Sequence, residues 1–540
     1  MGVQDFAPSI FEHNESVLNA GVLFSLPALM TQGLDKFFEI LSPLSAGYYG
    51  LQHIILSMCF MSLCRIKNPE QLKQYAPGEL GKLLGLDRVP EVGTFRKKLQ
   101  QIIKQSKADD IHQALFHSWV EDMPESFFYI DGHVRVYHGD QANLPKRFVS
   151  REKLCLSGTT EFWVNDQSGL PLMVITSELN SKLKEAVEEI IPKILQEFPS
   201  KDESSTEPVF VLVMDRESYE PAWFKKLWNE HKIAIITYRK NVKDKWDKNL
   251  FKPFAVKVFE QDVTMLLHEQ ETQLDGYCFR EVRKCSEDNH QTAIITTHPS
   301  LAIELIARKM FARWNQENFF KYLIENFDFD RMVEYGTEPV KQCAEIVNPQ
   351  YRQLSYQIKK AKEKKQRLDA KLFKKLEAKE QETVDNALKL IAKGSELVGQ
   401  INQCKINIDM LLVERKSIPA RITIGEMPQE KRYNKLKQEG KKIKNAIIML
   451  AYRTESALFN VLGEFYKYTG KEGRIIINEI FTSEADIIPD YQNKTLTIKL
   501  HSLSTPRAND AVIKLCQLLN ETETIYPYSC LLYTSPSPRD

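Results

Sequence analysis

The sequence has nine cysteines but no Cys-x-x-Cys pair. Cysteines spread in this way over 540 residues provide neither the disulfide framework of a small secreted domain nor the ligand spacing of a structural zinc site. Cys59 and Cys64 lie in an apolar run with helical spacing, where cysteines usually pack in the core. This cysteine usage is typical of a protein in a reducing cytosol.

An excess of charge of one sign is also missing. The 73 Lys and Arg residues and the 72 Asp and Glu residues leave a formal net charge of +1, so any attraction to nucleic acid must come from local patches. The composition, 43% hydrophobic and 27% charged, is that of a globular protein. At about 100–200 residues per domain, we expect three or four domains.

Hydrophobic runs long enough for a membrane span are lacking. The runs at 20–30 and 53–64 are shorter than the roughly 20 apolar residues that a bilayer requires, and both are predicted to be buried helices. The opening MGVQDFAPSIFEHNES lacks the basic region and apolar core of a signal peptide. Phe6 stands where a myristoylation motif has Ser or Thr.

Two apolar segments end in aspartate. SFFYIDGHVRVYHG contains Asp131 and VFVLVMDRESYEP contains Asp215, each at or near the end of a predicted strand. A buried strand gains nothing from a carboxylate at its tip unless that carboxylate binds something, and α/β sheets place ligand sites at such ends. Carboxylate oxygens suit Mg²⁺ or Mn²⁺. His133 is open to two interpretations, as a metal ligand or as an orienting group, and Glu217 is an auxiliary acid or a capping residue.

The order of predicted elements around these acids is that of an α/β domain. Residues 126–241 show three strands, a helix, a strand, a helix and a strand. Residues 242–298 are mostly β and form an insertion, after which a helical segment begins at Ser300.

A third acid is needed to complete the site, and the helix ARWNQENFFKY supplies Glu317. Arg313 and Lys321 lie four residues before and after it, on the same helix face. The alternative interpretation is a surface ion-pair ladder of these three residues, worth only about 0.3–0.5 kcal/mol per pair.

The first 125 residues are predicted to be helical and to contain a helix-turn-helix near 68–104. A second helix is expected to start near Val92–Thr94, with Thr94 as its N-cap. The candidate DNA-binding residues of this segment are Arg88, Thr94, Arg96, Lys97 and Lys98. The alternative is an ordinary helix pair with a solvated basic face.

A second basic stretch begins at Arg352, and within Arg352–Lys375 there are ten Lys or Arg residues and two Asp or Glu residues. Its apolar residues form a broken heptad, which predicts a helical hairpin or coiled coil. This segment is either a protein interface or an arm that tracks along DNA.

Taken together, these segments resemble a bacterial insertion-sequence transposase of the DDE type, with a β-rich insertion before the catalytic Glu. The resemblance covers almost the whole chain in order, through the stretches LLGLDRVPEVGTFRKKL, YIDGHVRVYHG, LSGTTEFWVND, VMDRESYEPAWFKKL, IAIITYRKN, HQTAIITT, RWNQENFFKYLIENFDFDRMVEYGTEP, IPARITIGE, AYRTESAL and LNETETIYP.

The resemblance implies that Asp131, Asp215 and Glu317 are the catalytic triad and hold two Mg²⁺ or Mn²⁺ ions, and that Arg313 and Lys321 contact DNA. Its related signature Tyr–Arg–Glu–Lys is incomplete here, because Met310 stands at the Tyr position and Ile324 at the Lys position. Lys321 is therefore expected to take the basic role.

The resemblance also gives a domain plan. The expected parts are a helical DNA-binding region at 1–125, a ribonuclease H-like catalytic core at 126–241 and 299–345, the β-rich insertion at 242–298, a basic helical or coiled-coil segment at 346–445, a C-terminal α+β region at 446–529, and a tail at 530–540. That tail, CLLYTSPSPRD, resembles the translation of a sequencing-library adapter and is expected to be non-native.

The implied function is metal-dependent cleavage at transposon ends and strand transfer into target DNA, in the cytoplasm and on the nucleoid. The implied partners are the terminal inverted repeats, the target duplex and a second protomer. The alternatives are a transposase-derived DNA-binding protein without catalysis, and a metal-dependent nuclease or phosphatase on a similar fold.

Overall fold

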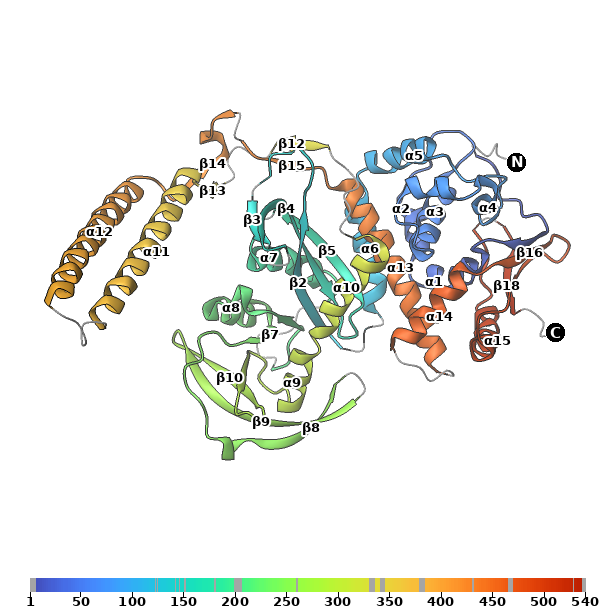
Figure 1. Cartoon of the computed structure of the whole chain (residues 1–540). Helices are drawn as coiled ribbons and strands as arrows, with labels where there is room; N and C mark the ends of the chain where they lie inside the picture. Colours follow the sequence, from blue (N-terminus) through green and yellow to red (C-terminus); the bar gives the residue numbers. More distant parts are fainter. Residues whose placement is uncertain are drawn as a thin grey trace. The chain divides into compact units, whose positions relative to one another are not determined.

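The computed structural model divides the chain into two compact units (Figure 1). The first consists of Met1–His138, Pro145–Tyr335 and Lys437–Asp540, and the second of Gly139–Leu144 and Gly336–Leu436. The structure describes residues 6–121, 123, 125–140, 142–144, 146–149, 152–178, 181–198, 206–258, 261–329, 336–339, 345–377, 384–429, 432–464, 470–527 and 529–536.

Helices from both ends of the chain form one core in the first unit. The N-terminal α-helices are α1 (Leu26–Thr31), α2 (Leu34–Ile40), α3 (Leu51–Leu63), α4 (Pro77–Lys82), α5 (Val92–Lys104) and α6 (Ala108–Glu121), and the C-terminal ones are α13 (Glu439–Gly463), α14 (Gly470–Thr482) and α15 (Pro506–Glu521). Helix α13 packs against α1, α3, α5, α6 and α14. As expected for the run at 53–64, α3 is buried along most of its length. The run at 20–30 is buried too, but it is split into a 3-10 helix η1 (Ala20–Ser25) and α1, which has a proline in its first turn.

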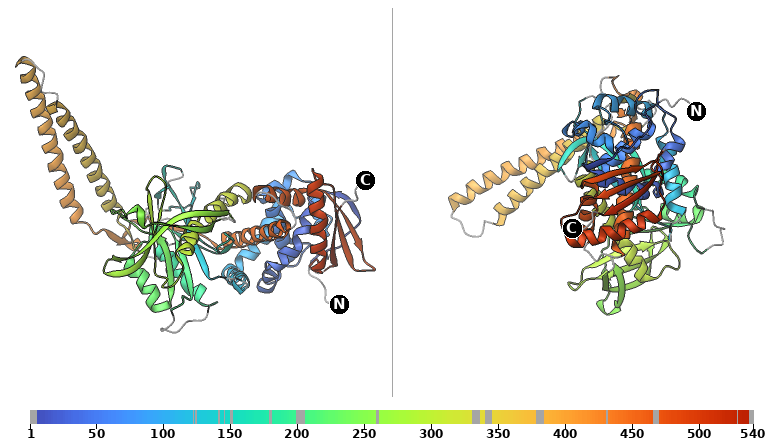
Figure 2. Two further views of the ribbon diagram at one scale, coloured as in Figure 1. Left: turned by 90° about the horizontal axis from the view of Figure 1, so that it is seen from below. Right: turned by 90° about the vertical axis from the view of Figure 1, so that its right-hand side faces the viewer.

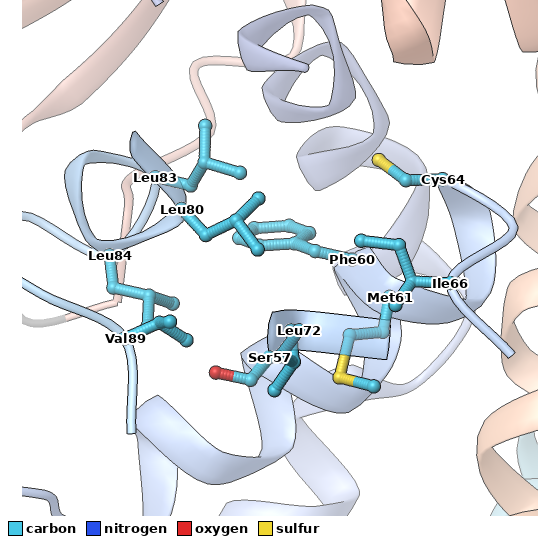
Figure 3. A pocket seen from close by; sticks show the side chains of 10 residues that line it. All are labelled: Ser57, Phe60, Met61, Cys64, Ile66, Leu72, Leu80, Leu83, Leu84 and Val89. Atoms are coloured by element: carbon cyan, nitrogen blue, oxygen red, sulfur yellow. The ribbon is translucent and has the colours of Figure 1, made fainter. Parts of the chain in front are cut away.

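A small cavity lies inside the N-terminal helices, among Phe60, Leu72, Leu80 and Leu84, with the hydroxyl of Ser57 at its wall (Figure 3). Its volume of about 20 Å³ is close to the minimum that holds one water molecule. The cavity is therefore a packing void and not a ligand site.

The largest sheet contains the predicted α/β order and the insertion together. Its strands are β2 (Phe127–Val136), β3 (Lys146–Val149), β4 (Leu154–Asn165), β5 (Pro171–Glu178), β6 (Phe210–Met214), β7 (Ile233–Tyr238), β8 (Lys252–Val258), β9 (Gln261–Leu274), β10 (Tyr277–Cys285) and β11 (Gln291–Thr296). They lie in the order β3-β4-β2-β6-β7-β11-β10-β9-β8, with β5 also paired to β4. Strands β2, β6 and β7 are mutually parallel, whereas the others pair antiparallel. The insertion thus extends the sheet beyond β7.

Helices cover the two faces of the parallel strands. On one face, Phe128 and Leu212 belong to the same core as α7 (Leu183–Leu195). On the other face, Tyr129 and Val213 pack with Met310 of α9 (Ile303–Phe311). This alternation follows from the two-residue period of a strand. Two further helices adjoin the sheet, α8 (Pro221–His231), which connects β6 to β7, and α10 (Trp314–Phe327), which follows α9.

A second sheet joins the two ends of the chain, in the order β1-β16-β17-β18. Its strands are β1 (Asn14–Val17), β16 (Ala485–Asp490), β17 (Thr495–Leu500) and β18 (Leu531–Pro536). The N-terminal region is therefore not wholly helical, because β1 pairs with a strand near the other end of the chain. Strand β18 lies in the tail that we expected to be non-native, and it pairs in parallel with β17.

The second unit is a long helical hairpin on a short β base. Helices α11 (Pro349–Glu377) and α12 (Val384–Lys416) lie side by side (Figure 2). At the base, β12 (Thr337–Pro339) pairs with β15 (Asn434–Leu436), and β13 (Glu345–Val347) pairs with β14 (Arg421–Thr423), both antiparallel. A helical hairpin was one of the two structures that the broken heptad predicted.

Across the ranges that the structure describes, no helix combines the length and the apolar character needed to cross a bilayer. The cysteines of those ranges are all free, and Cys59 and Cys64 are buried, as expected for core residues.

Candidate active site

Asp131 and Asp215 lie beside each other on neighbouring parallel strands. The last β2–β6 pair in register is Ile130 with Met214, and each aspartate is the next residue of its chain. Asp215 directly follows the end of β6, as predicted, but Asp131 is in the middle of β2 and not at its end, because β2 continues to Val136 in pairing with β4. By the two-residue alternation, both belong to the face that packs against α9. Each is also oriented locally, because the backbone N–H of Gly132 donates to Asp131 Oδ1 at 2.9 Å and that of Arg216 donates to Asp215 Oδ1 at 2.8 Å.

Helix α10 brings Glu317 to this pair through Arg313. Arg313 Nη1 donates to Asp131 Oδ2 at 3.3 Å, and Arg313 Nη2 donates to Glu317 Oε1 at 3.4 Å. The Arg313 side chain is 14% exposed, compared with 26% for Asp131 and 46% for Glu317. The interpretation as a surface ion-pair ladder is therefore incomplete. Arg313 does pair with Glu317, but it also pairs with Asp131 of the sheet. Lys321 is exposed and makes no ion pair with the residues that the structure describes.

The other two acids affect the pKa of Asp131. Its partial burial, reinforced by the negative charges of Asp215 and Glu317, raises its pKa from 3.8 to about 6, against the opposing effects of Arg313 and the Gly132 N–H. Without a bound cation, the carboxyl group takes up a proton as the pH falls through about 6. Carboxyl groups whose pKa is raised by burial and by neighbouring negative charges are common in functional sites.

The donor set is made of carboxylate oxygens, which fits Mg²⁺ or Mn²⁺. Within the described ranges, no three acid, histidine or cysteine side chains are grouped closely enough to hold a metal ion as they stand. The Arg313 guanidinium contacts both Asp131 and Glu317, and its single positive charge offsets one of their two negative charges.

His133 is not placed as a metal ligand. It is buried, and its ring stacks on Phe320 with 5.2 Å between centroids and lies 4.9 Å from Phe329. Trp163 is also buried against Phe319, whereas Trp314 is 59% exposed. Met310, at the place of the signature Tyr, is a core residue.

Two residues near the acids were missed by the sequence reasoning. Gln316 is buried, and its Nε2 donates to the carbonyl of Tyr129 at 3.2 Å, the carbonyl of Trp163 at 3.0 Å and Asn165 Oδ1 at 2.9 Å. Because Trp163 pairs with Asp131 across β2 and β4, this single amide fixes α10 to the strands that carry the site. The other is Tyr238, at the end of β7, where the charges of Arg313, Asp215 and Glu317 all act on its hydroxyl.

The predicted DNA-binding residues of the N-terminal helices are only partly exposed. Arg88 and Lys97 are exposed, and Arg96 is exposed but paired with Glu70. Lys98 is buried, and its Nζ donates to the carbonyl of Ser45 at 2.6 Å, so its charge is turned away from the surface.

The predicted N-cap at Thr94 is wrong, although the helix does start within the expected range. Helix α5 begins at Val92 with Glu91 as its N-cap, and the N–H of Phe95 bonds to the carbonyl of Glu91 at 2.8 Å. Thr94 lies inside the first turn because Glu91, with a non-helical ψ of 150°, already occupies the N-cap position.

Comparison with known families identifies the family of the whole chain. A family model described as "Transposase protein" matches residues 1–534. The chain belongs to this transposase family. A search of curated proteins found no match. Membership gives the transposase a role in transposition, the general chemistry of a DNA-cleaving transferase, and DNA as a partner.

In the transposase, Gln316→Met is expected to slow DNA cleavage by about 10–100-fold, the usual range for residues that orient active-site ligands. The change keeps the side-chain volume but removes the three hydrogen bonds that fix α10 to β2 and β4. DNA affinity should stay within about threefold of wild type, and both should be measured on one labelled duplex. Asn318→Ala, at an exposed position on the same helix, is the control and should behave as wild type. Equal activity of Gln316→Met and wild type would remove the positioning role.

Proposed function

We propose that this protein is a DDE transposase of a bacterial insertion sequence, which cuts DNA at the element's terminal inverted repeats and joins the ends to target DNA by cut-and-paste transposition. The observation that carries the proposal is that Asp131 and Asp215 follow the last paired residues of β2 and β6 on one sheet face, while Arg313 joins Asp131 to Glu317 of α10.

The order of the central strands supports a ribonuclease H-like core. The short β3, which pairs with β4, is additional to the five predicted strands of this α/β segment, which in chain order are β2, β4, β5, β6 and β7. In space they lie in the order β5-β4-β2-β6-β7, antiparallel on the β4 side of β2 and parallel on the β6 side. This is the arrangement in which the first and fourth strands each present an acid, here Asp131 and Asp215.

Asp131, Asp215 and Glu317 would together hold two divalent cations. When bound, such ions lower the pKa of a water molecule and stabilise charge on the leaving oxygen. The carboxylates of Asp131 and Asp215, each oriented by a backbone N–H, set the position of the attacking oxygen relative to the scissile phosphate. Arg313 and Lys321 supply cationic donors for the non-bridging phosphate oxygens.

The bonds exchanged are the same in both steps. In cleavage, the water molecule loses a proton as its oxygen bonds to phosphorus, the bond from phosphorus to the 3′ oxygen breaks, and the released 3′ oxygen takes up a proton. In strand transfer, the freed 3′-OH loses its proton and bonds to a phosphorus of the target strand, and the 3′ oxygen released there takes up a proton. Because two transposon ends must be joined, we propose a homodimer on DNA.

The proposal is tested by incubating the protein with a labelled duplex that carries the element's own end, with Mg²⁺, Mn²⁺ or EDTA. We expect nicking at the end with either metal and none with EDTA, while binding, measured by gel shift, persists in all three. Binding without cleavage in every condition would contradict the proposal and favour a transposase-derived DNA-binding protein. Cleavage that resists EDTA would exclude the metal mechanism.

A further inference from the structure

The helical hairpin of the second unit has a defined apolar seam. Leu354, Ile358, Ala361 and Leu368 of α11 are buried, and Leu368 packs with Ile401 and Cys404 of α12. The seam fixes which sides of α11 remain accessible, because each residue advances about 100° around a helix.

A groove runs along one flank of this seam and contains cations from both helices. The groove has two adjoining parts, with volumes of about 420 and 480 Å³. Lys362 and Gln366 line both parts. The cations that line this hairpin groove are Lys359, Lys362 and Lys365 of α11 and Lys405 and Arg415 of α12. Two acids, Glu363 and Asp409, also line it.

Several of these cations have no acidic partner among the described residues of the hairpin. Lys365 pairs with Asp369 at 2.8 Å, and Glu363 pairs with Lys360 at 3.5 Å. Lys359, Lys362 and Lys405 make no ion pair with any residue that the structure describes. Five cations against two acids leave the groove positive, although the whole chain is nearly neutral.

We propose that the hairpin groove binds the phosphate backbone of duplex DNA. From Ser355 to Gln366 the groove follows α11 for about 16 Å, the axial length of about five phosphates of one strand. Lysines in a concave groove between two helices can contact successive phosphates without reading bases, so the groove holds DNA independently of sequence. The inference rests on the DNA binding that the proposed function requires, and not on its cleavage chemistry.

The opposite flank of α11 provides a matched control. Lys360, Lys364, Arg367 and Lys371 are exposed and form a cationic stripe, about 140° around the helix from Lys359 and Lys362. Two full-length triple variants therefore remove the same charge from different flanks. The groove variant carries Lys359→Gln, Lys362→Gln and Lys405→Gln, and the stripe variant carries Lys364→Gln, Arg367→Gln and Lys371→Gln.

Affinity for a duplex is measured in EDTA over a range of salt concentrations, with and without the element's end. Each lost phosphate contact makes the slope of log K against log salt shallower by about 0.9. We expect the groove variant to show a slope shallower by about 2–3 and an affinity at least about tenfold lower at 0.1 M salt, on both duplexes. The stripe variant should change the slope by less than about 1.

Lysine acetylation footprinting of the wild type then locates the contact. DNA should protect Lys362 and Lys405 while Lys364 and Lys371 remain reactive. Equal slopes for the two variants, or protection of the stripe in place of the groove, would overturn the proposal. The proposal would also be overturned if the groove variant bound duplex DNA as the wild type does but lost binding of single-stranded RNA. EDTA prevents metal-dependent cleavage during these measurements. The DNA-binding result can therefore be interpreted even if the proposed catalysis is wrong.

Discussion

Asp131→Asn and Glu317→Gln are each expected to lower DNA cleavage at least about a thousandfold. Both changes keep the shape of the side chain and remove one negative charge, so the carboxylate cluster can no longer balance two divalent cations. Loss of about 4 kcal/mol of transition-state stabilisation, within the several kcal/mol that a catalytic metal supplies, corresponds to that factor. The measurement is single-turnover cleavage of the labelled end duplex in Mg²⁺.

DNA binding by the same variants should remain within about threefold of wild type, because the acids repel phosphate rather than attract it. Glu325→Gln is the matched control, since Glu325 is exposed on the same helix, two turns beyond Glu317, and should leave cleavage unchanged. Cleavage that survives Glu317→Gln would show that another residue is the third acid. Loss of cleavage together with loss of binding would point to a folding defect.

Glu455→Ala is expected to destabilise the first unit by about 3–5 kcal/mol, the range for breaking a buried ion pair by removing one partner. Glu455 lies on α13 and is fully buried. It accepts hydrogen bonds from Arg65 at 2.6 Å, from Arg474 at 2.9 Å and from the hydroxyl of Tyr322 on α10. Without the carboxylate, two largely buried guanidinium groups lose their common counter-charge.

The pH dependence of this effect has a definite sign. Burial alone would raise the pKa of Glu455, but the charges of Arg65 and Arg474 hold it below 4.5 in the folded protein. The stabilisation is therefore complete above pH 4.5 and is lost as the pH falls through the folded-state pKa. Thermal unfolding of the wild type and Glu455→Ala at pH 7 and at pH 4 tests both statements. Glu464→Ala, at the exposed C-cap that follows the same helix, should not shift the transition. A shift for Glu455→Ala no larger than that of this control would refute the structural role.

The parts of the site that the sequence could reveal are those with a local signature. Asp131 and Asp215 stand out because an acid directly after an apolar run is unusual for a buried strand, although β2 continues beyond Asp131 to Val136. The hairpin was predictable for a similar reason, since its heptad pattern and its charges are readable within one segment. Glu317 needed its helical spacing to Arg313, and also the resemblance, to be chosen from the many acids of the chain.

Other features depend on contacts between distant segments, which periodicity cannot show. Gln316 looks like any polar residue of α10, and only the fold places its amide against the carbonyls of Tyr129 and Trp163. Strand β1 has its partner β16 at the other end of the chain. Thr94 was assigned as an N-cap from residue type alone, whereas the backbone of Glu91 had already begun the helix.

The paired strands at the base of the hairpin have a consequence for how this protein can be altered. Because β12 pairs with β15 and β13 pairs with β14, the chain enters and leaves the hairpin at neighbouring points, about 5 Å apart. Whole helical turns can therefore be added or removed at the far end of the hairpin without changing the two points at which the chain enters and leaves it. The hairpin is a cassette whose reach can be lengthened, shortened or exchanged while the base strands keep their register.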